Sequence, residues 1–297
     1  MSVLSQTADI QMEIIIGDDG FGKETPCIIQ RLMRQHPGVI KYFKHKQNIG
    51  ASENCKFLVR EAQGQYIAHL DGDDFWLPGK IKKQLEWLDH NPDSAACYSN
   101  AVVISDDGEL RSIFGPIIYE PVSLDLLLVK GNFLNHSSML YRAKYKNSIT
   151  ELVGSLFDYK LHLNFARIAP VGYINSALTV YRLGSEHSMV KNTPALVQDL
   201  YFEAINTALL NYPVSAHVRW RSLTHFWQTI ALEAMVKGRL KWLITWAQKI
   251  LALYPRESLR VLSFGTFLAI WELLVLVKNR ALARFFRASH LPVLHRL

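Results

Sequence analysis

Residues 64–84 read GQYIAHLDGDDFWLPGKIKKQ, and this stretch decides the fold class. Tyr66 to Leu70 is a short apolar run that predicts a buried β-strand, and it leads directly into Asp71-Gly72-Asp73-Asp74. Pro78 then begins a stretch with helical spacing that extends to Leu88. A strand followed by an acidic turn and a helix is typical of an α/β layer.

The same pattern recurs on both sides of this stretch. Glu13 to Gly17 is an apolar, β-branched run that ends at Asp18-Asp19-Gly20. Val39 to Phe43 and Ala95 to Tyr98 are further strand candidates, and Ala51 to Ala62 has helical spacing. Strands and helices that alternate at this spacing predict an α/β fold with a mostly parallel sheet flanked by helices.

The composition and the distribution of strand signals indicate how the chain divides into domains. Of its 297 residues, 49% are hydrophobic and 20% charged, which excludes an intrinsically disordered protein. Strand signals fade near residue 195, so we expect one domain over 1–194 and a helical region over 195–297. The three cysteines form no CxxC pair, which argues against a disulfide framework or structural zinc and fits a reducing cytosol.

The C-terminal region is strongly basic. From Tyr201 onward there are 13 Lys or Arg residues against 4 Asp or Glu, and several tryptophans lie among them. This pattern fits a membrane surface, although tryptophans that pack the helices against the N-terminal domain are an equal alternative. No nucleic-acid-binding motif accompanies the charge, so no nucleic-acid partner is expected. Val261 to Val277 is apolar over 17 residues but contains Glu272, so a packed or interfacial helix competes with a membrane span.

The acidic turns carry the chemistry. Ligands of open α/β sheets bind outside the carboxyl ends of the strands, and carboxylate oxygens suit Mg²⁺ and Mn²⁺. Three carboxylates within residues 71–74 repel one another unless they are solvated or hold a cation, which favours a metal site there. Asp18-Asp19-Gly20 alone fits an ordinary turn equally well.

Three of these stretches together resemble a family 2 glycosyltransferase of the GT-A fold: EIIIGDDG at 13–20, QNIGASEN at 47–54, and residues 64–84. The resemblance implies a nucleotide-sugar donor. It also implies that Asp71-Gly72-Asp73 is the D-x-D motif, in which Asp71 and Asp73 hold Mn²⁺ or Mg²⁺. The residues expected to contact the nucleotide or its diphosphate are Asp18, Asp19, Asn48, Asn54, Asp71 and Arg182.

Later motifs extend the resemblance to about residue 190. LFDY at 156–159 resembles the second acidic motif, which implies that Asp158 is the general base, although an Asp before a Tyr is more often a helix N-cap. ALTVYRLGSEHS at 177–188 implies that Arg182 lies near the diphosphate and that His187 is a further metal ligand. NFLNHSSMLY at 132–141 resembles the acceptor side, with no single residue assigned.

The chain departs from the family at its start. Ser2 to Thr7 already matches the helix that follows the family's first strand, so that strand is expected to be missing. Either translation begins upstream or the chain is truncated and inactive. Phe21, Lys23 and Glu53 also differ from the family pattern and leave local contacts to the nucleotide open.

The resemblance implies an inverting, metal-dependent transferase of surface-polysaccharide biosynthesis. It would move a sugar, from a UDP-sugar in preference, to a hydroxyl of a glycan or lipid-linked acceptor at the cytoplasmic face of the inner membrane. One alternative is a catalytically disabled scaffold in an assembly complex. Another is a nucleotidyltransferase, which would carry a Gly-rich phosphate loop near its start, and none is visible.

Overall fold

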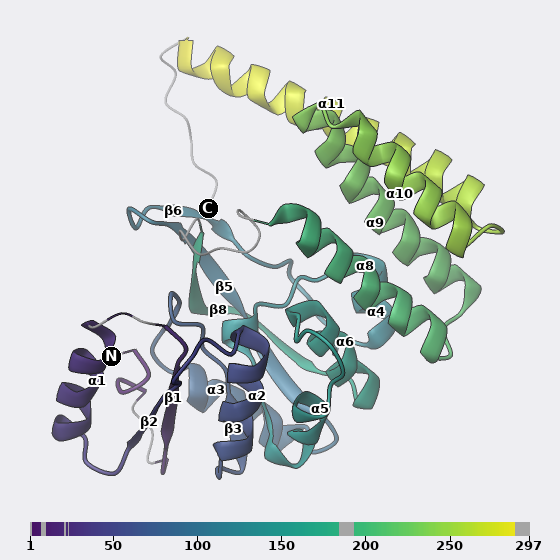
Figure 1. The fold of residues 1–297 in the computed structure, drawn as a ribbon. Helices are drawn as coiled ribbons and strands as arrows, with labels where there is room; N and C mark the ends of the chain where they lie inside the picture. The colour runs from purple at the N-terminus through teal and green to yellow at the C-terminus, as the bar shows by residue number, and fades with distance from the viewer. Residues whose placement is uncertain (1, 7–9, 21, 23, 184–192, 289–297) are drawn as a thin grey trace. The chain divides into compact units, whose positions relative to one another are not determined.

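The computed structural model describes residues 2–6, 10–20, 22, 24–183 and 193–288, which form two compact units (Figure 1). The first unit comprises residues 1–127 and 132–211, and the second comprises 128–131 and 212–297. Helix α8 (Pro194–Asn211) belongs to the first unit. The two units divide near residue 211, and α8 packs on α6 (Asp158–Ile168) of the first unit. The domain boundary expected near residue 195 stays a prediction.

The first unit contains two sheets. Strands β1 (Ile14–Asp18) and β2 (Ile40–Lys44) form a parallel pair of their own. The larger sheet has the order β3-β7-β5-β8-β4, with β6 beside β5. Its strands are β3 (Tyr66–Ala68), β4 (Phe75–Trp76), β5 (Ala96–Ser105), β6 (Leu110–Ile113), β7 (Leu140–Arg142) and β8 (Gly172–Leu183).

The predicted α/β fold is confirmed, but the larger sheet is mixed rather than mostly parallel. Only β5 and β8 run parallel in it. The pairs β3–β7, β4–β8, β5–β6 and β5–β7 are antiparallel. The reason is that β4, β6 and β7 are short return strands, and their brief apolar runs gave no distinct signal in the sequence.

Helices cover both faces of the larger sheet. Successive side chains of a strand point to opposite faces. On β5, Cys97 packs with Ile81 and Leu88 of α3 (Lys80–His90), whereas the next residue, Tyr98, contacts the ring of His162 on α6 (Asp158–Ile168). Helices α3 and α6 therefore lie on opposite faces, with the core between each of them and the sheet.

The other helices of the first unit surround these layers. Helix α2 lies against β1 and α5, and α5 lies against α6. Helix α1, in which only Ile29 is buried, was not predicted from the sequence. The bounds are α1 (Glu24–Gln35), α2 (Ala51–Glu61), α4 (Leu124–Lys130), η1 (His136–Ser138), η2 (Ala143–Tyr145) and α5 (Asn147–Thr150).

The second unit is helical. It consists of α9 (Ala216–Lys237), α10 (Leu240–Leu253) and α11 (Ser258–Ala288), together with the end of α4. Helix α11 packs closely on α9, because a Cβ atom at Gly265 would lie only 2.7 Å from the Trp227 ring. Residues 258–279 of α11 are long and apolar enough to cross a membrane, and only 17% of the most apolar window is buried. Of the alternatives for this segment, a helix enclosed in a core is therefore wrong.

Candidate active site

The acidic loop between β3 and β4 is fixed by one serine. The hydroxyl group of Ser137, on η1, donates a hydrogen bond to Asp74 Oδ2 over 2.6 Å and accepts one from the Asp71 N–H over 3.1 Å. The indole N–H of Trp76 in turn donates to the Ser137 carbonyl over 2.8 Å. Ser137 on η1 therefore holds both ends of the loop, and Trp76 on β4 holds Ser137 in place.

The end of β8 brings Arg182 to the same loop. The Arg182 backbone N–H donates to Asp74 Oδ1 over 3.0 Å, and its Nε donates to the Asp73 carbonyl over 3.2 Å. An open cleft of about 630 Å³ lies here, lined by Ser2, Gly72, Asp73, Asp74, Phe75 and Arg182. Asp73 of the predicted D-x-D motif and the predicted diphosphate residue Arg182 thus meet at one cleft, with Asp71 in the same loop.

Asp158 reaches this cluster from the start of α6. Tyr181, next to Arg182, shows the grouping: its pKa is raised first by burial and then by the charges of Asp74, Asp73, Asp158 and Asp71. Such effects fall off steeply with distance, so all four carboxylates lie near this one ring. The structure therefore brings the predicted base, Asp158, to the predicted metal ligands.

The carboxylates of the cluster are held at an electrostatic cost. Asp71 as a residue is exposed, although many protein atoms surround its carboxyl group. Burial raises the pKa of that group, and the charges of Asp158 and Asp73 raise it further. Burial also raises the pKa of Asp74 to about 6, against the hydrogen bonds from Ser137 and Arg182. A bound cation would relieve this cost.

A buried histidine lies beneath the cluster. Burial by itself would lower the pKa of His136, but the nearby charges of Asp158 and Asp71 outweigh it and raise the pKa to about 10. The His136 ring lies 4.9 Å from that of His69 and 5.9 Å from that of His162, measured between centroids. Sequence reasoning missed both His136 and Ser137. Their signal was present in the stretch at 132–141, where no residue was assigned.

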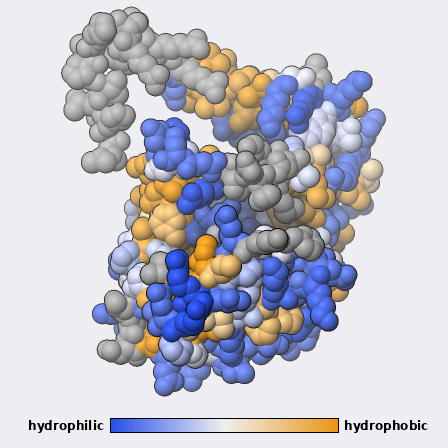
Figure 2. All heavy atoms as spheres, turned by 60° about the vertical axis from the view of Figure 1, so that its left-hand side comes forward, coloured by the Kyte–Doolittle hydropathy of each residue, from blue (hydrophilic) through white to orange (hydrophobic). Residues whose placement is uncertain are grey.

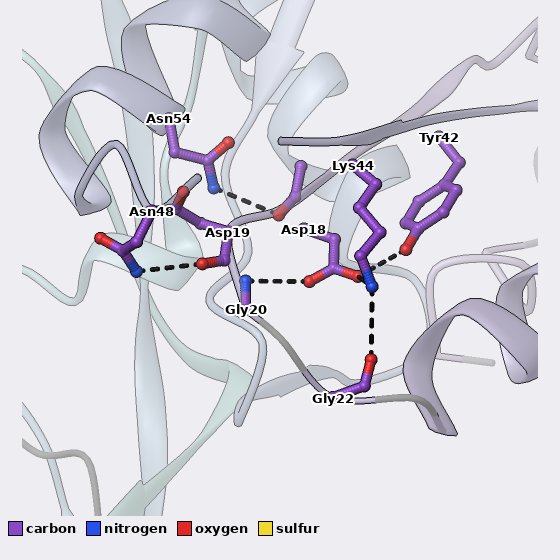
Figure 3. A network of polar contacts seen from close by, with 9 residues as sticks. Asp18, Asp19, Gly20, Gly22, Tyr42, Lys44, Asn48 and Asn54 are labelled. Carbon is purple, nitrogen blue, oxygen red and sulfur yellow. Dashed lines mark hydrogen bonds and ion pairs between the residues drawn. The ribbon is translucent and has the colours of Figure 1, made fainter. Parts of the chain in front are cut away.

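The other acidic pair, Asp18 and Asp19, is arranged differently (Figure 3). Asp18 accepts hydrogen bonds from the Tyr42 hydroxyl and the Gly20 N–H and forms an ion pair with Lys44 at 3.7 Å. The hydrogen bond from Tyr42 is the largest cause that lowers the pKa of Asp18. Asp19 accepts from the N–H groups of Ile49 and Gly50 over 2.7 and 2.8 Å. Both carboxylates therefore have partners within the protein.

Asn48 and Asn54 hydrogen-bond to backbone carbonyl groups near the end of β1. Asn48 Nδ2 donates to the Asp19 carbonyl over 3.0 Å, and Asn54 Nδ2 donates to the Gly17 carbonyl over 3.1 Å. Asn54 Oδ1 also lies 3.0 Å from His45 Nε2. Four of the six residues expected at the nucleotide or its diphosphate thus come together near the carboxyl ends of β1 and β2, where they hydrogen-bond to the chain itself. His187, the remaining expected ligand, lies outside the described residues.

The residues present fit a partial cation site. Within the described ranges, no three His, Cys, Asp or Glu side chains come together as a complete metal-binding set. Asp71 and Asp73 nevertheless offer hard oxygen donors whose mutual repulsion a cation would reduce. Mg²⁺ is commonly held by one or two carboxylates together with substrate phosphates. Two carboxylates beside an open cleft match that arrangement.

Comparison with known proteins identifies the family. The sequence model of the family described as "Glycosyl transferase family 2" matches residues 1–149, half of the chain. The chain belongs to glycosyltransferase family 2. The expected family and its GT-A fold are thereby confirmed.

Individual relatives and one solved structure agree with this assignment. The chain is 31% identical over 180 residues to an uncharacterised protein of Mycobacterium tuberculosis, which covers 60% of this chain and 52% of that protein. It is 25% identical over 209 residues to the chondroitin synthase of Escherichia coli, covering 70% and 30%. Residues 1–349 of TarS from S. aureus, solved in complex with UDP, superpose with a TM-score of 0.60 at 13% identity, covering 91% and 82%. This family 2 chain thus spans about half the length of the mycobacterial relatives it matches.

Proposed function

We propose that this chain is an inverting, metal-dependent glycosyltransferase. It moves a sugar from a nucleoside diphosphate sugar, with a UDP-sugar as the favoured donor, to a hydroxyl group of a glycan or lipid-linked acceptor. The observation that carries the proposal is the cleft lined by Asp73 and Arg182, with Asp71 in the same loop and Asp158 near enough for its charge to act on Asp71. Family membership and the fold shared with UDP-bound TarS support it.

The donor half of the site is formed by the D-x-D carboxylates and Arg182. Asp71 and Asp73 would hold Mn²⁺ or Mg²⁺, which when bound stabilises negative charge on the leaving diphosphate. The Arg182 guanidinium carries a permanent positive charge and a planar set of N–H donors that suits phosphate oxygens. Its Nε bond to the Asp73 carbonyl fixes the side chain beside the loop. Asp74 holds this loop and the end of β8 together.

The acceptor half depends on Asp158. Its carboxylate takes the proton of the acceptor hydroxyl while that oxygen attacks the anomeric carbon. The new carbon–oxygen bond forms on the face opposite the leaving diphosphate, whose bond to the sugar breaks, so the configuration inverts. His136 lies near Asp158, whose charge is the largest cause that raises the pKa of this histidine.

A thermal-shift panel tests the donor site. UDP, GDP, CMP and dTDP are each added with and without Mn²⁺ to the parent chain, to Asp73→Ala, and to Asp106→Ala as a control with an exposed acidic residue outside the cleft. A nucleotide at 100 times its Kd adds about 2.7 kcal/mol of stability. We expect one nucleotide, UDP first, to stabilise the parent and the control only with Mn²⁺, and to leave Asp73→Ala unchanged.

A panel in which no nucleotide binds favours the alternative of a catalytically disabled scaffold protein. The observation behind this second candidate is that β1 and β2 form their own sheet and that Asp18, Asp19, Asn48 and Asn54 hydrogen-bond to the chain itself. If no nucleotide shifts the melting temperature of the parent with or without metal, the transferase proposal fails. If a nucleotide binds equally well to Asp73→Ala, the metal-dependent part fails.

A further inference from the structure

Helix α11 exposes a continuous apolar face. Large apolar side chains recur at helical spacing at Phe264, Phe267, Ile270, Trp271, Leu274 and Val277. Trp271 is 62% exposed, and Phe267 and Leu274 are each 59% exposed. Figure 2 shows apolar side chains in orange gathered along the helices in the upper part of the view. An exposed apolar patch of this extent, next to charged residues, marks an interaction surface.

The opposite face of α11 is committed to α9. Val261, Gly265 and Ala269 are buried there, and the Trp227 indole N–H of α9 donates to the Leu262 carbonyl over 3.1 Å. Gln228 of α9 also donates to Glu272 Oε2 over 2.9 Å. One stripe of α11 therefore has a partner within its own unit. At the edge of the apolar stripe, the Phe264 ring lies 5.6 Å from that of Trp220 on α9, whereas Phe267, Trp271 and Leu274 stay largely exposed.

This packing argues against a helix that crosses the bilayer. Helix α9 runs along α11 and carries charged side chains that include Arg219, Arg221, Glu233 and Lys237. If α11 spanned the membrane, it would either draw these charges into hydrocarbon or lose its contact with α9, and charged groups at membrane depth are expensive. If α11 lies in the plane of the interface, only its outer stripe enters the lipid and α9 keeps its place.

The positive charge of the second unit favours an anionic bilayer over a second copy of the chain as the partner of this face. From Tyr212 onward the chain has 13 Lys or Arg residues against 3 Asp or Glu. A second copy placed on the α11 face would bring the same positive charge to the contact, whereas an anionic bilayer complements it. Exposed tryptophan, here Trp271, suits the boundary between headgroups and acyl chains.

We propose that the second unit binds anionic phospholipid bilayers, with α11 lying in the plane of the interface and its outer apolar face inserted below the headgroups. The inference concerns residues 212–288 and does not depend on the transferase chemistry. It defines an interaction surface with a lipid partner, and a transferase on that surface would meet an acceptor that is itself held in the membrane.

Vesicle flotation of the full chain tests the lipid partner. Vesicles of pure phosphatidylcholine are compared with vesicles that contain about 30% phosphatidylglycerol, at low salt and at 0.5 M NaCl. We expect strong flotation with the anionic vesicles at low salt and a large reduction at high salt, because screening weakens attraction between surface charges. Absence of flotation with both kinds of vesicle, or stronger binding to the neutral ones, would overturn the proposal.

A double variant tests the face. Phe267→Ser with Leu274→Ser removes two inserted side chains, and each loss should weaken partitioning about tenfold or more, since burying one large apolar side chain contributes that much. The matched control is Leu110→Ser with Ile117→Ser, which removes two equally exposed apolar residues from the first unit. Circular dichroism confirms that both variants are folded. Equal loss in the two variants would remove α11 as the binding face.

Two further measurements distinguish in-plane lipid binding from a membrane-spanning helix and from contact with a second copy of the chain. An interfacial helix is released from vesicles by alkaline carbonate, whereas a helix that stays in the membrane pellet spans it and contradicts the in-plane arrangement. Sedimentation velocity without lipid addresses a second copy. If the parent is a dimer, the double variant is a monomer and neither floats, the face is a dimer interface and the lipid proposal is wrong.

Discussion

The two acidic loops of the first unit look alike in sequence but differ in their electrostatic state. Both follow a strand, Asp18-Asp19-Gly20 after β1 and Asp71-Gly72-Asp73-Asp74 after β3. In the first loop, hydrogen bonds from the protein lower the pKa of Asp18, with the Tyr42 hydroxyl as the main donor. In the second loop, burial raises the pKa of both Asp71 and Asp74.

This difference separates structural carboxylates from reactive ones. A lowered pKa means that the folded protein already stabilises the charge, so the carboxylate needs no ligand. A raised pKa means that folding forces the charge into an unfavourable place, and a cation or a proton from substrate relieves it. The comparison predicts that substitutions of Asp71, Asp73 and Asp158 change activity, whereas substitutions of Asp18 and Asp19 change stability. Asp74 accepts hydrogen bonds from Ser137 and Arg182, so its substitution is expected to act on stability as well.

The largest effect is expected for Asp158→Asn. The amide keeps the size of the side chain but cannot accept the acceptor proton, so the transfer rate should fall by about 10²- to 10⁴-fold, the usual contribution of a general base. Nucleotide binding should persist, because the donor half of the site is intact. Initial rates with a donor sugar, together with the melting temperature in UDP and Mn²⁺, measure the two effects.

Asp18→Asn is the matched comparison for this variant. It should keep most of its transfer rate at temperatures where it is folded and should show a lower melting temperature. If Asp158→Asn retains full activity, Asp158 is only a helix-start residue. If Asp18→Asn is folded and inactive, the division between the two loops is wrong.

The second prediction concerns pH and Asp74. Its pKa is about 6 in the folded protein and 3.8 as the reference value, so the folded state binds more protons between these values. The contribution of Asp74 to stability is therefore full below about pH 4 and is lost as the pH rises through 6. Asp74→Asn should remove this dependence. The stability of the variant relative to the parent should rise between pH 4 and pH 7 by at most about 3 kcal/mol, and by less where solvent screens the charge.

Denaturant unfolding of both proteins at several pH values, without divalent cations, measures this difference. Asp107→Asn serves as control, because hydrogen bonds lower the pKa of this exposed carboxyl group and the trend should not appear. If the difference in unfolding free energy between Asp74→Asn and the parent stays constant over pH 4–7, burial does not raise the pKa of Asp74.

The sequence predicted those parts of the fold that have local signals. The strands that became β1, β2 and β3 and the helices that became α2 and α3 lie within a few residues of their predicted bounds, because apolar runs and turn residues mark them. The antiparallel return strands were missed, because pairing across Leu140 or Phe75 depends on the register of distant segments. The carboxylate cluster was predicted from motif order, and the structure brings its members together.

The support of the site could not be predicted in the same way. Ser137 and His136 act on the acidic loop from more than 60 residues away along the chain, and the resemblance of the stretch at 132–141 singles out neither of them. Likewise, whether an Asp is held by protein N–H groups, as Asp19 is, or repelled by its neighbours, as Asp71 is, depends on tertiary contacts. Sequence patterns therefore locate carboxylates better than they locate charge states.

The third prediction concerns Asp19. Its two oxygens accept the N–H groups of Ile49 and Gly50 just before α2, so Asp19→Ala leaves two donors without their charged acceptor. The variant should lose about 1–3 kcal/mol of stability, because hydrogen bonds to charged groups exceed those between neutral groups. Asp106→Ala, on an exposed turn, should change little. If Asp19→Ala keeps its stability but loses nucleotide binding, Asp19 is a nucleotide ligand as the family resemblance implied.

The smallest effect is expected for Tyr42→Phe. The substitution removes the hydroxyl that donates to Asp18 and leaves the ring in place, so stability at neutral pH should fall by about 1 kcal/mol. Because Tyr42 lowers the pKa of Asp18, its contribution is present above the reference value of 3.8 and is lost as the pH falls through the lower folded value. The parent and the variant should therefore differ at pH 7 and converge near pH 3 in denaturant unfolding. A difference of equal size at both pH values would mean that the ring packing, and not the bond to the Asp18 carboxylate, had changed.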